Sequence, residues 1–527
     1  MILRQFFVGM LPRQQAFAVG CLVSALALTT GGCGDNTVKA REEAQIAEAL
    51  FNQGDIAGAK QAMARALALR DDQLDILLLD ARIKSQSGDM RGAYEAYRTI
   101  LALDPRQPEA LLGVAQIGLG AGETERSRDA IETILAMAPG QPDALLLKGI
   151  HALNRKDYTE AMEMADQLLA GDENDRRGIV LKARVLALTG RRDEALAMLR
   201  HTADTIGNDE MIAIALLENA RDEGNLEVML DQFSLIRQSR QQSVDLAIDE
   251  TNVRYKGGDK DGARAAGFAI LDRFGNDSSS MQRLRNLWRE YDPDPLTTQQ
   301  RAELAQNGAL NAQLTAARHY LAQGKPDAAL AIIENARDVR ALGLRARIAV
   351  AADAPRSIEM VAGILGQDTT NCDALAAAAE WNLARNKPND AIDPAQKSAT
   401  TCRDSSDGYL LLARAYDELK RPAGAERVYR EGVAAHPNDY AITAAYAAWL
   451  LRAGRPDAAE AIVDRLTNRT PQRLSSWALL EKTCTTIGDK ACVTAAREGA
   501  QTARKDFRID LAPGERASNP LLGQQWR

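Results

Sequence analysis

A spacing of 34 residues runs through most of this 527-residue chain and constrains its fold more than any other feature. Glycines recur at this spacing or at twice it, and Lys156 takes the one missing place. A unit of this length cannot bury its apolar face alone, so neighbouring units must stack into a continuous core. The glycines that share this spacing are Gly54, Gly88, Gly122, Gly190, Gly224 and Gly258.

The unit around Gly88 shows how each repeat is built from two helices. An apolar-periodic stretch over 74–83 ends near Gly88, because glycine supplies the left-handed residue that stops a helix. A second stretch over 93–103 ends before Pro105, which cannot continue a helix. The chain is also rich in alanine, and only 5% of its residues are aromatic. The pattern predicts an all-α fold of antiparallel helix pairs.

These features resemble the tetratricopeptide repeat, which has small residues at its eighth, twentieth and twenty-seventh positions, Gly-Asp at its turn and proline near its end. Gly149 and Ala183 take the eighth position, Gly88-Asp89 forms the turn, and Ala93 takes the twentieth position. The resemblance covers roughly residues 40–504. It implies a right-handed α-solenoid, a superhelix whose curvature accumulates from unit to unit.

Changes in the 34-residue spacing predict how the solenoid is divided. Seven repeats share one register over 40–275, and a second array with the same spacing occupies 310–504. Residues 276–309 lack clear repeat positions, so we expect a degenerate helical connector that forms a hinge or a boundary between the arrays. The tail over 505–527 leaves the repeat, and we expect it to cap the last repeat or to be disordered.

The amino-terminal residues have the pattern of an export signal. Arg4 and Arg13 precede an apolar run over 16–28, which is too short to span a bilayer but has the size of a secretory signal. Small residues then lead to Cys33, an arrangement that resembles the lipobox of bacterial lipoproteins. Two alternatives remain, which are ordinary cleavage after Ala25-Leu26-Ala27 and an uncleaved membrane anchor.

The lipobox resemblance implies a location as well as a modification. In that family the signal is removed before the cysteine, so residues 1–32 would be the signal peptide and Cys33 would carry lipid. Residues 33–39 would form a short tether. Gly34 stands where enterobacterial lipoproteins retained in the inner membrane have aspartate. We therefore expect a membrane lipoprotein in the envelope of a Gram-negative bacterium, facing the periplasm, with the outer membrane favoured.

Four cysteines remain after export, and they predict two disulfides. Each pair is local to one repeat, and an oxidising periplasm permits disulfide formation. No Cys-x-x-Cys motif is present, so a zinc or redox motif is disfavoured. Free buried thiols are the alternative. The candidate pairs are Cys372 with Cys402 and Cys484 with Cys492.

Composition and motifs argue against an enzyme and against nucleic-acid binding. The formal net charge of −7 does not suit a protein that must neutralise phosphates. The four histidines are far apart in sequence, and no nucleophile elbow, phosphate loop or His-Glu-x-x-His motif occurs. We expect no catalytic residues, no metal and no cofactor.

The tetratricopeptide resemblance implies a binding groove lined by the first helix of each pair. An apolar stripe from the fifth and sixth positions, with polar residues at the ninth, would suit a helix or an extended peptide. The alternative is that about half of these aliphatic residues only pack between helices. The candidate groove residues are Leu78, Leu79, Arg82, Leu112, Gln116, Leu146, Leu147, Arg184 and Glu218.

Together these features predict a lipid-anchored scaffold that binds protein partners in the periplasm. The combination of repeats and lipobox resembles the repeat-containing lipoproteins of exopolysaccharide synthesis and export, including the exosortase-linked group. This resemblance implies a role in a polysaccharide export machine. An assembly factor for outer-membrane proteins, or an activator of a cell-wall enzyme, is the alternative, and an enzyme with an unrecognised site is a third.

Overall fold

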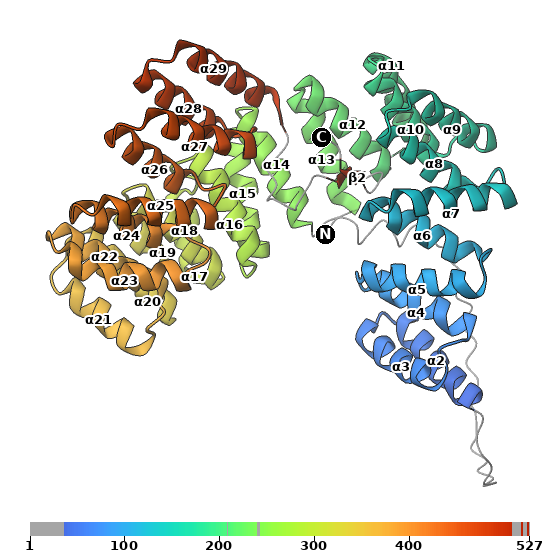
Figure 1. Ribbon diagram of the computed structural model, residues 1–527, viewed down its shortest axis with the longest axis horizontal. Coiled ribbons are helices and arrows are strands. Elements are labelled where there is room, and N and C mark those ends of the chain that lie inside the picture. The colour runs from blue at the N-terminus through green and yellow to red at the C-terminus, as the bar shows by residue number, and fades with distance from the viewer. Residues whose placement is uncertain (1–35, 208, 240–242, 508–517, 520–523, 526–527) are drawn as a thin grey trace, which may run out of the picture. The chain divides into compact units, whose positions relative to one another are not determined.

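The computed structural model describes residues 36–207, 209–239, 243–507, 518–519 and 524–525, which contain the helices α2 to α29 (Figure 1). The β structure in these ranges is one antiparallel pair, β1 (Ser518–Asn519) and β2 (Gln524–Gln525). The predicted all-α solenoid is therefore confirmed. The expected signal peptide and the lipid site at Cys33 lie outside the described residues.

The chain divides into two compact units, and the division falls between Asn219 and Ala220, within α12. In the first unit, the helices from α2 to α11 each pack against the next in sequence order (Figure 1). Its helices are α2 (Asn36–Asn52), α3 (Ile56–Leu69), α4 (Leu74–Gln86), α5 (Met90–Leu103), α6 (Pro108–Ala121), α7 (Thr124–Met137), α8 (Pro142–Asn154), α9 (Tyr158–Gly171), α10 (Arg176–Leu188), α11 (Arg192–Ile206) and the start of α12 (Glu210–Glu223).

The second unit continues the helical pairs to the end of the repeats (Figure 1). Its first helices are α13 (Leu226–Ser239), α14 (Val244–Lys256), α15 (Lys260–Phe274), α16 (Ser278–Tyr291), α17 (Thr298–Asn307), α18 (Leu310–Ala322), α19 (Pro326–Ile333), α20 (Val339–Ala351) and α21 (Ser357–Gln367). The later ones are α22 (Cys372–Ala384), α23 (Pro388–Thr401), α24 (Asp407–Glu418), α25 (Pro422–Ala435), α26 (Tyr440–Arg452), α27 (Pro456–Arg469), α28 (Leu474–Ile487) and α29 (Lys490–Lys505).

The turn inside most repeats contains a left-handed residue, and one of two caps then begins the next helix. Gly88 has φ +80°, a left-handed conformation that ends α4, and the Asp89 side chain then accepts a hydrogen bond from the Gly92 amide to begin α5. In the later repeats proline replaces this cap, and Pro422 and Pro456 occupy the first turn of α25 and α27. Both devices satisfy or remove amide donors that a helix start would otherwise leave unpaired.

The small residue at the twentieth position of the repeat marks where two helices come closest. Ala59, Ala93 and Ala161 are fully buried there, and Ser127 takes the same place in the third helix pair, α6 and α7. The Ser127 hydroxyl donates a hydrogen bond to the Ala115 carbonyl at 2.7 Å, which satisfies the buried polar group. Stacking of these pairs gives a series of apolar cores that run along each unit.

The boundary expected at 276–309 is not where the compact units divide. These residues form α16 and α17, and one apolar core runs through them from Ile248 on α14 to Ile348 on α20. Trp288 on α16 is 1% exposed and belongs to this core. Sequence spacing detected the loss of the repeat pattern but not the aromatic packing that replaces it.

The repeat region begins earlier than expected. Residues 36–39, expected in a tether, form the first turn of α2, because the Arg70 guanidinium donates a hydrogen bond to the Thr37 hydroxyl at 2.6 Å. At the other end Phe507 is buried, and the Asn252 side chain donates to its carbonyl at 3.4 Å. The rest of the tail lies outside the described residues, except for β1 and β2. Among the helices described, none has both the length and the apolarity to cross a bilayer.

Candidate protein-binding groove

The first helices of successive repeats lie next to one another and form one face of each unit. In the first unit α6 contacts α8 and α8 contacts α10, and in the second unit α22, α24, α26 and α28 contact one another in sequence order. Arginine–carboxylate pairs bridge these helices. They include Arg177 with Asp143 at 2.6 Å, Arg347 with Glu380 at 2.6 Å and Arg452 with Asp417 at 3.2 Å.

Six of the nine candidate groove residues of the first unit are half-buried, and four of the six lie on α4 and α6. Leu78 on α4 and Leu112 on α6 are half-buried, and so are Arg82 and Gln116 one helical turn further along the same helices. The Arg82 guanidinium donates a hydrogen bond to Glu109 at 2.5 Å, and this bond raises the pKa of Arg82. An acidic partner would therefore compete with Glu109 for this cation.

The other candidate leucines are more deeply placed. Leu79, Leu146 and Leu147 are 8%, 3% and 6% exposed, and Leu147 belongs to the core that extends from α4 to α8. Arg184 and Glu218 are half-buried, and each of them interacts with other residues. The candidate leucines that remain partly open to solvent therefore lie on α4 and α6, next to the half-buried Arg82 and Gln116.

The second unit has an open hollow at the same repeat positions. A cavity of about 540 Å³ lies on α24, α25 and α26, within the size range of ligand pockets. Its apolar part consists of Leu410, Leu411, Tyr429, Ala445 and Ala448. Two alanines on α26 face two half-buried leucines on α24, so the small side chains leave the space that the leucines border.

These residues are not among the predicted groove residues, although they occupy the repeat positions from which those residues were chosen. Leu410, Leu411 and Arg414 occupy the fifth, sixth and ninth positions of the repeat that begins at residue 406, counted from Lys420 in the turn. Those are the positions chosen for the candidate groove of the first unit. Applying the same rule to the second array would have identified the cavity.

Charged side chains of both signs surround the apolar part of the cavity. Arg414 pairs with Glu418 at 2.8 Å along α24, and Arg452 of α26 pairs with Asp417 at 3.2 Å. The Trp449 indole also donates to Asp417 at 3.0 Å, which fixes the carboxylate. An apolar floor with a balanced charged rim suits a partner segment that buries two or three apolar side chains.

A partly buried ion network joins α18, α20, α22 and α24, and α24 borders this cavity. Arg347 of α20 pairs with Asp407 of α24 at 2.8 Å, and Arg318 of α18 pairs with Asp373 of α22 at 2.7 Å. Burial alone would raise the pKa of Asp407, but the charge of Arg347 outweighs it and holds that pKa below its ordinary value. Because removing one member would leave an uncompensated charge, the network favours one arrangement of these helices.

Both candidate cysteine pairs are bonded in the structure. The Sγ atoms of Cys372 and Cys402 join the start of α22 to the end of α23, and those of Cys484 and Cys492 join α28 to α29. The Cα–Cα distance is 5.7 Å in each pair, within the range that a disulfide spans. Both disulfides lie within single helix pairs of the second unit.

Two segments of the chain match known repeats. Residues 84–149 and residues 418–483 match the tetratricopeptide repeat family, so each unit contains one segment that matches this family. None of the curated proteins matches the chain. The segment 418–483 includes much of the cavity on α24, α25 and α26.

Solved structures with a similar fold share little sequence with this chain. A tetratricopeptide repeat protein from Parabacteroides merdae ATCC 43184 is 16% identical, with a TM-score of 0.40, over 47% of this chain and 99% of its own. PilW, described as a widely conserved type IV pilus biogenesis factor, is 18% identical over 40% of this chain and 96% of its own, with a TM-score of 0.34. PilF of Pseudomonas aeruginosa is 15% identical over the same shares, with a TM-score of 0.32.

Proposed function

We propose that this chain is a scaffold that binds protein partners through the first helices of its repeats and that it performs no catalysis. The observation that carries this proposal is the cavity on α24, α25 and α26, which combines half-buried leucines with small side chains and a charged rim. Such a surface offers apolar contacts and orienting charges but no group activated for chemistry. The repeat match at 418–483 supports the same use.

The proposal includes a place in the cell envelope. Residues 1–32 are proposed to be a signal peptide, and Cys33 is proposed to carry the lipid that holds the chain to a membrane, with the repeats in the periplasm and the outer membrane favoured. Support comes from the short apolar run before Cys33 and the small residues that lead to it. The two disulfides in the second unit agree with an oxidising compartment.

We further propose that the partners belong to a machinery for exopolysaccharide synthesis or export. This step rests on the resemblance of the sequence to repeat-containing lipoproteins of such systems, and fold alone does not supply it. The experiment is a crosslinked affinity purification of the full chain from its own membranes, with the Cys33→Ala variant beside it.

The outcomes of this purification separate the parts of the proposal. Recovery of glycosyltransferases or an export channel with the wild type, lost with Cys33→Ala, supports both the partners and the anchor. Recovery of barrel-assembly or cell-wall proteins would replace the exopolysaccharide role with the alternative. A wild-type chain that crosslinks to no protein, or that stays soluble with an unmodified Cys33, would contradict the scaffold or the anchor, respectively.

A further inference from the structure

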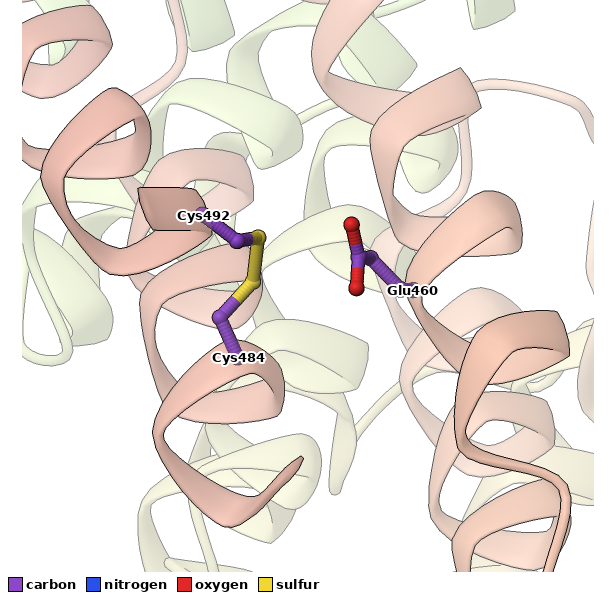
Figure 2. Close-up of side chains that lie close together, drawn as sticks. All are labelled: Glu460, Cys484 and Cys492. Carbon is purple, nitrogen blue, oxygen red and sulfur yellow. A yellow bond between two sulfur atoms is a disulfide. The ribbon is translucent and has the colours of Figure 1, made fainter. Parts of the chain in front are cut away.

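Three side chains that commonly bind metals lie together at the last repeat. Glu460 on α27, Cys484 on α28 and Cys492 on α29 place one carboxylate oxygen and two sulfur atoms within 4.8 Å of one another. Figure 2 shows the Glu460 carboxylate facing the Cys484–Cys492 disulfide across the space between α27 and the last helix pair. Among the residues that the structure describes, this is the one such group of three.

The arrangement depends on the oxidation state of the cysteines. In the disulfide the two sulfur atoms are bonded to each other and are not thiolates, which are the form of cysteine that binds metals. An external dithiol supplies two electrons and two protons and becomes a disulfide itself, whereas a phosphine supplies two electrons and becomes its oxide, with the protons and the oxygen taken from one water molecule. Either reductant converts the Cys484–Cys492 disulfide into two thiols. Loss of the two thiol protons to solvent or to a metal's bound water then gives two sulfur ligands beside the carboxylate.

The spacing and burial of the three groups suit a tetrahedral ion. Two sulfurs at about 2.3 Å from zinc in a tetrahedral site are about 3.8 Å apart, so small side-chain rotations would bring all three atoms to one centre. Cys484 is fully buried, whereas Glu460 and Cys492 are half-buried. The site is therefore closed by protein around Cys484 and open to solvent beside Glu460 and Cys492. A water molecule can serve as the fourth ligand on the open side.

The charges around Glu460 favour a cation. The carboxylates of Asp457, Asp464 and Asp489 lie close enough to Glu460 to repel its negative charge. Asp489 is held close by its cap of α29, where it accepts a hydrogen bond from the Cys492 amide at 3.0 Å. A bound divalent ion would relieve this concentration of negative charge.

We propose that reduction of the Cys484–Cys492 disulfide turns the last repeat into a binding site for a thiophilic divalent cation of the Zn²⁺ type. The ligands are the Sγ atoms of Cys484 and Cys492 and the carboxylate of Glu460. The disulfide ties α28 to α29 within one repeat, whereas the metal ties both helices to α27 of the preceding repeat. Reduction in the presence of the metal would thus keep α28 joined to α29 and add a link to the preceding repeat.

The test is a metal titration of the full chain in its oxidised and reduced forms. The protein is reduced with a phosphine, freed of reductant without air, and titrated with Co²⁺, whose thiolate bonds absorb in the near ultraviolet, and with Zn²⁺ against a coloured chelator. We expect one equivalent of tightly bound metal in the reduced form and none in the disulfide form. Reduced protein that binds no metal would overturn the proposal.

Variants locate the site and keep the result independent of folding. Cys372→Ser with Cys402→Ser removes the other disulfide, which has no third ligand beside it among the described residues, and binding must persist. Glu460→Gln keeps both thiols and should weaken binding by about tenfold or more. Binding that survives in Cys484→Ser, or that Glu460→Gln leaves unchanged, would also overturn the proposal. Helix content by circular dichroism is measured for each variant, so that loss of binding is scored only where the fold is retained.

Discussion

The ammonium group of Lys256, at the end of α14, lies 3.2 Å from the carbonyl oxygen of Ala503, near the end of α29 and 247 residues further along the chain. The same ammonium donates to the carbonyls of Gln472, at 3.1 Å, and Asp506. The last carbonyls of a helix have no partner inside the helix and carry its negative dipole end. One lysine therefore ties the beginning of the second unit to its last helix pair.

Replacing Lys256 by methionine keeps the aliphatic stem and removes these hydrogen bonds. We expect the free energy of unfolding of the second unit to fall by about 1.5–3 kcal/mol, as for hydrogen bonds that involve a charged group. Hydrogen exchange at the end of α29 should also become faster. Lys482→Met, at an exposed position of α28, is the matched control. Equal stability of the two variants in denaturant titrations would show that the Lys256 contacts do not hold the unit together.

Two glycines of α6 should respond to alanine in opposite directions. A Cβ at Gly113 would lie 2.3 Å from the ring of Tyr97, whereas one at Gly120 would have nothing within 4 Å. Gly113→Ala should therefore cost about 1–3 kcal/mol through overpacking. Gly120→Ala should stabilise the helix by roughly 0.5–1 kcal/mol, because alanine is the better helix former. Thermal unfolding of both variants checks the signs, and a stable Gly113→Ala would contradict the close packing of Tyr97.

The two disulfides should stabilise the second unit by different amounts. Cys372–Cys402 closes 30 residues and Cys484–Cys492 closes 8, so loop-closure entropy predicts losses of about 3–4 and about 2–3 kcal/mol when each is removed. Denaturant titrations of Cys372→Ser with Cys402→Ser, and of Cys484→Ser with Cys492→Ser, measure these losses. Added reductant should then lower the stability of each variant only by the contribution of the disulfide that it still contains. Mass mapping of non-reduced peptides that shows free thiols would refute the pairing.

His319 should make the second unit sensitive to mild acid. It is 1% exposed, its ring centroid lies 5.4 Å from that of Trp288, and burial lowers its pKa to about 4 from an ordinary 6.5. Because the unfolded chain binds this proton more readily, the stabilisation is complete above pH 6.5 and is lost as the pH falls towards 4. The loss amounts to about 3 kcal/mol. Between pH 6.5 and 4, the free energy of unfolding of His319→Phe should fall by about 3 kcal/mol less than that of the wild type. Identical pH profiles of stability for the two proteins would contradict the prediction.

The fold could be predicted because residues within each repeat determine the structure of that repeat. Gly88 at the turn, Ala93 at the close approach and Pro105 after the second helix each impose a backbone or packing condition that recurs every 34 residues. The structure differs where this local logic is replaced by distant contacts. Trp288 belongs to one core with Tyr320. The spacing of repeat residues could not reveal this shared core, so residues 276–309 were expected to form a boundary.

The groove was less predictable, because the fifth and sixth positions do not by themselves determine exposure. Leu78 remains half-buried while Leu146, at the equivalent position, is 3% exposed. Whether such a leucine is open depends on the size of its neighbours on the next helix, and alanines at 445 and 448 open the cavity in the second unit. A repeat pattern specifies the row of positions, and the adjacent side chains decide which of them a partner can reach.

We propose that a protein partner binds the cavity on α24, α25 and α26. Ala448 is exposed in this cavity, so Ala448→Glu should fill it with a charge at little cost to folding, and Ala423→Glu on the exposed face of α25 is the matched control. We would measure the amount of crosslinked partner recovered with wild type and both variants at equal helix content. We expect Ala448→Glu to lose the partner and Ala423→Glu to retain it, whereas equal recovery with all three proteins would show that no partner binds this cavity.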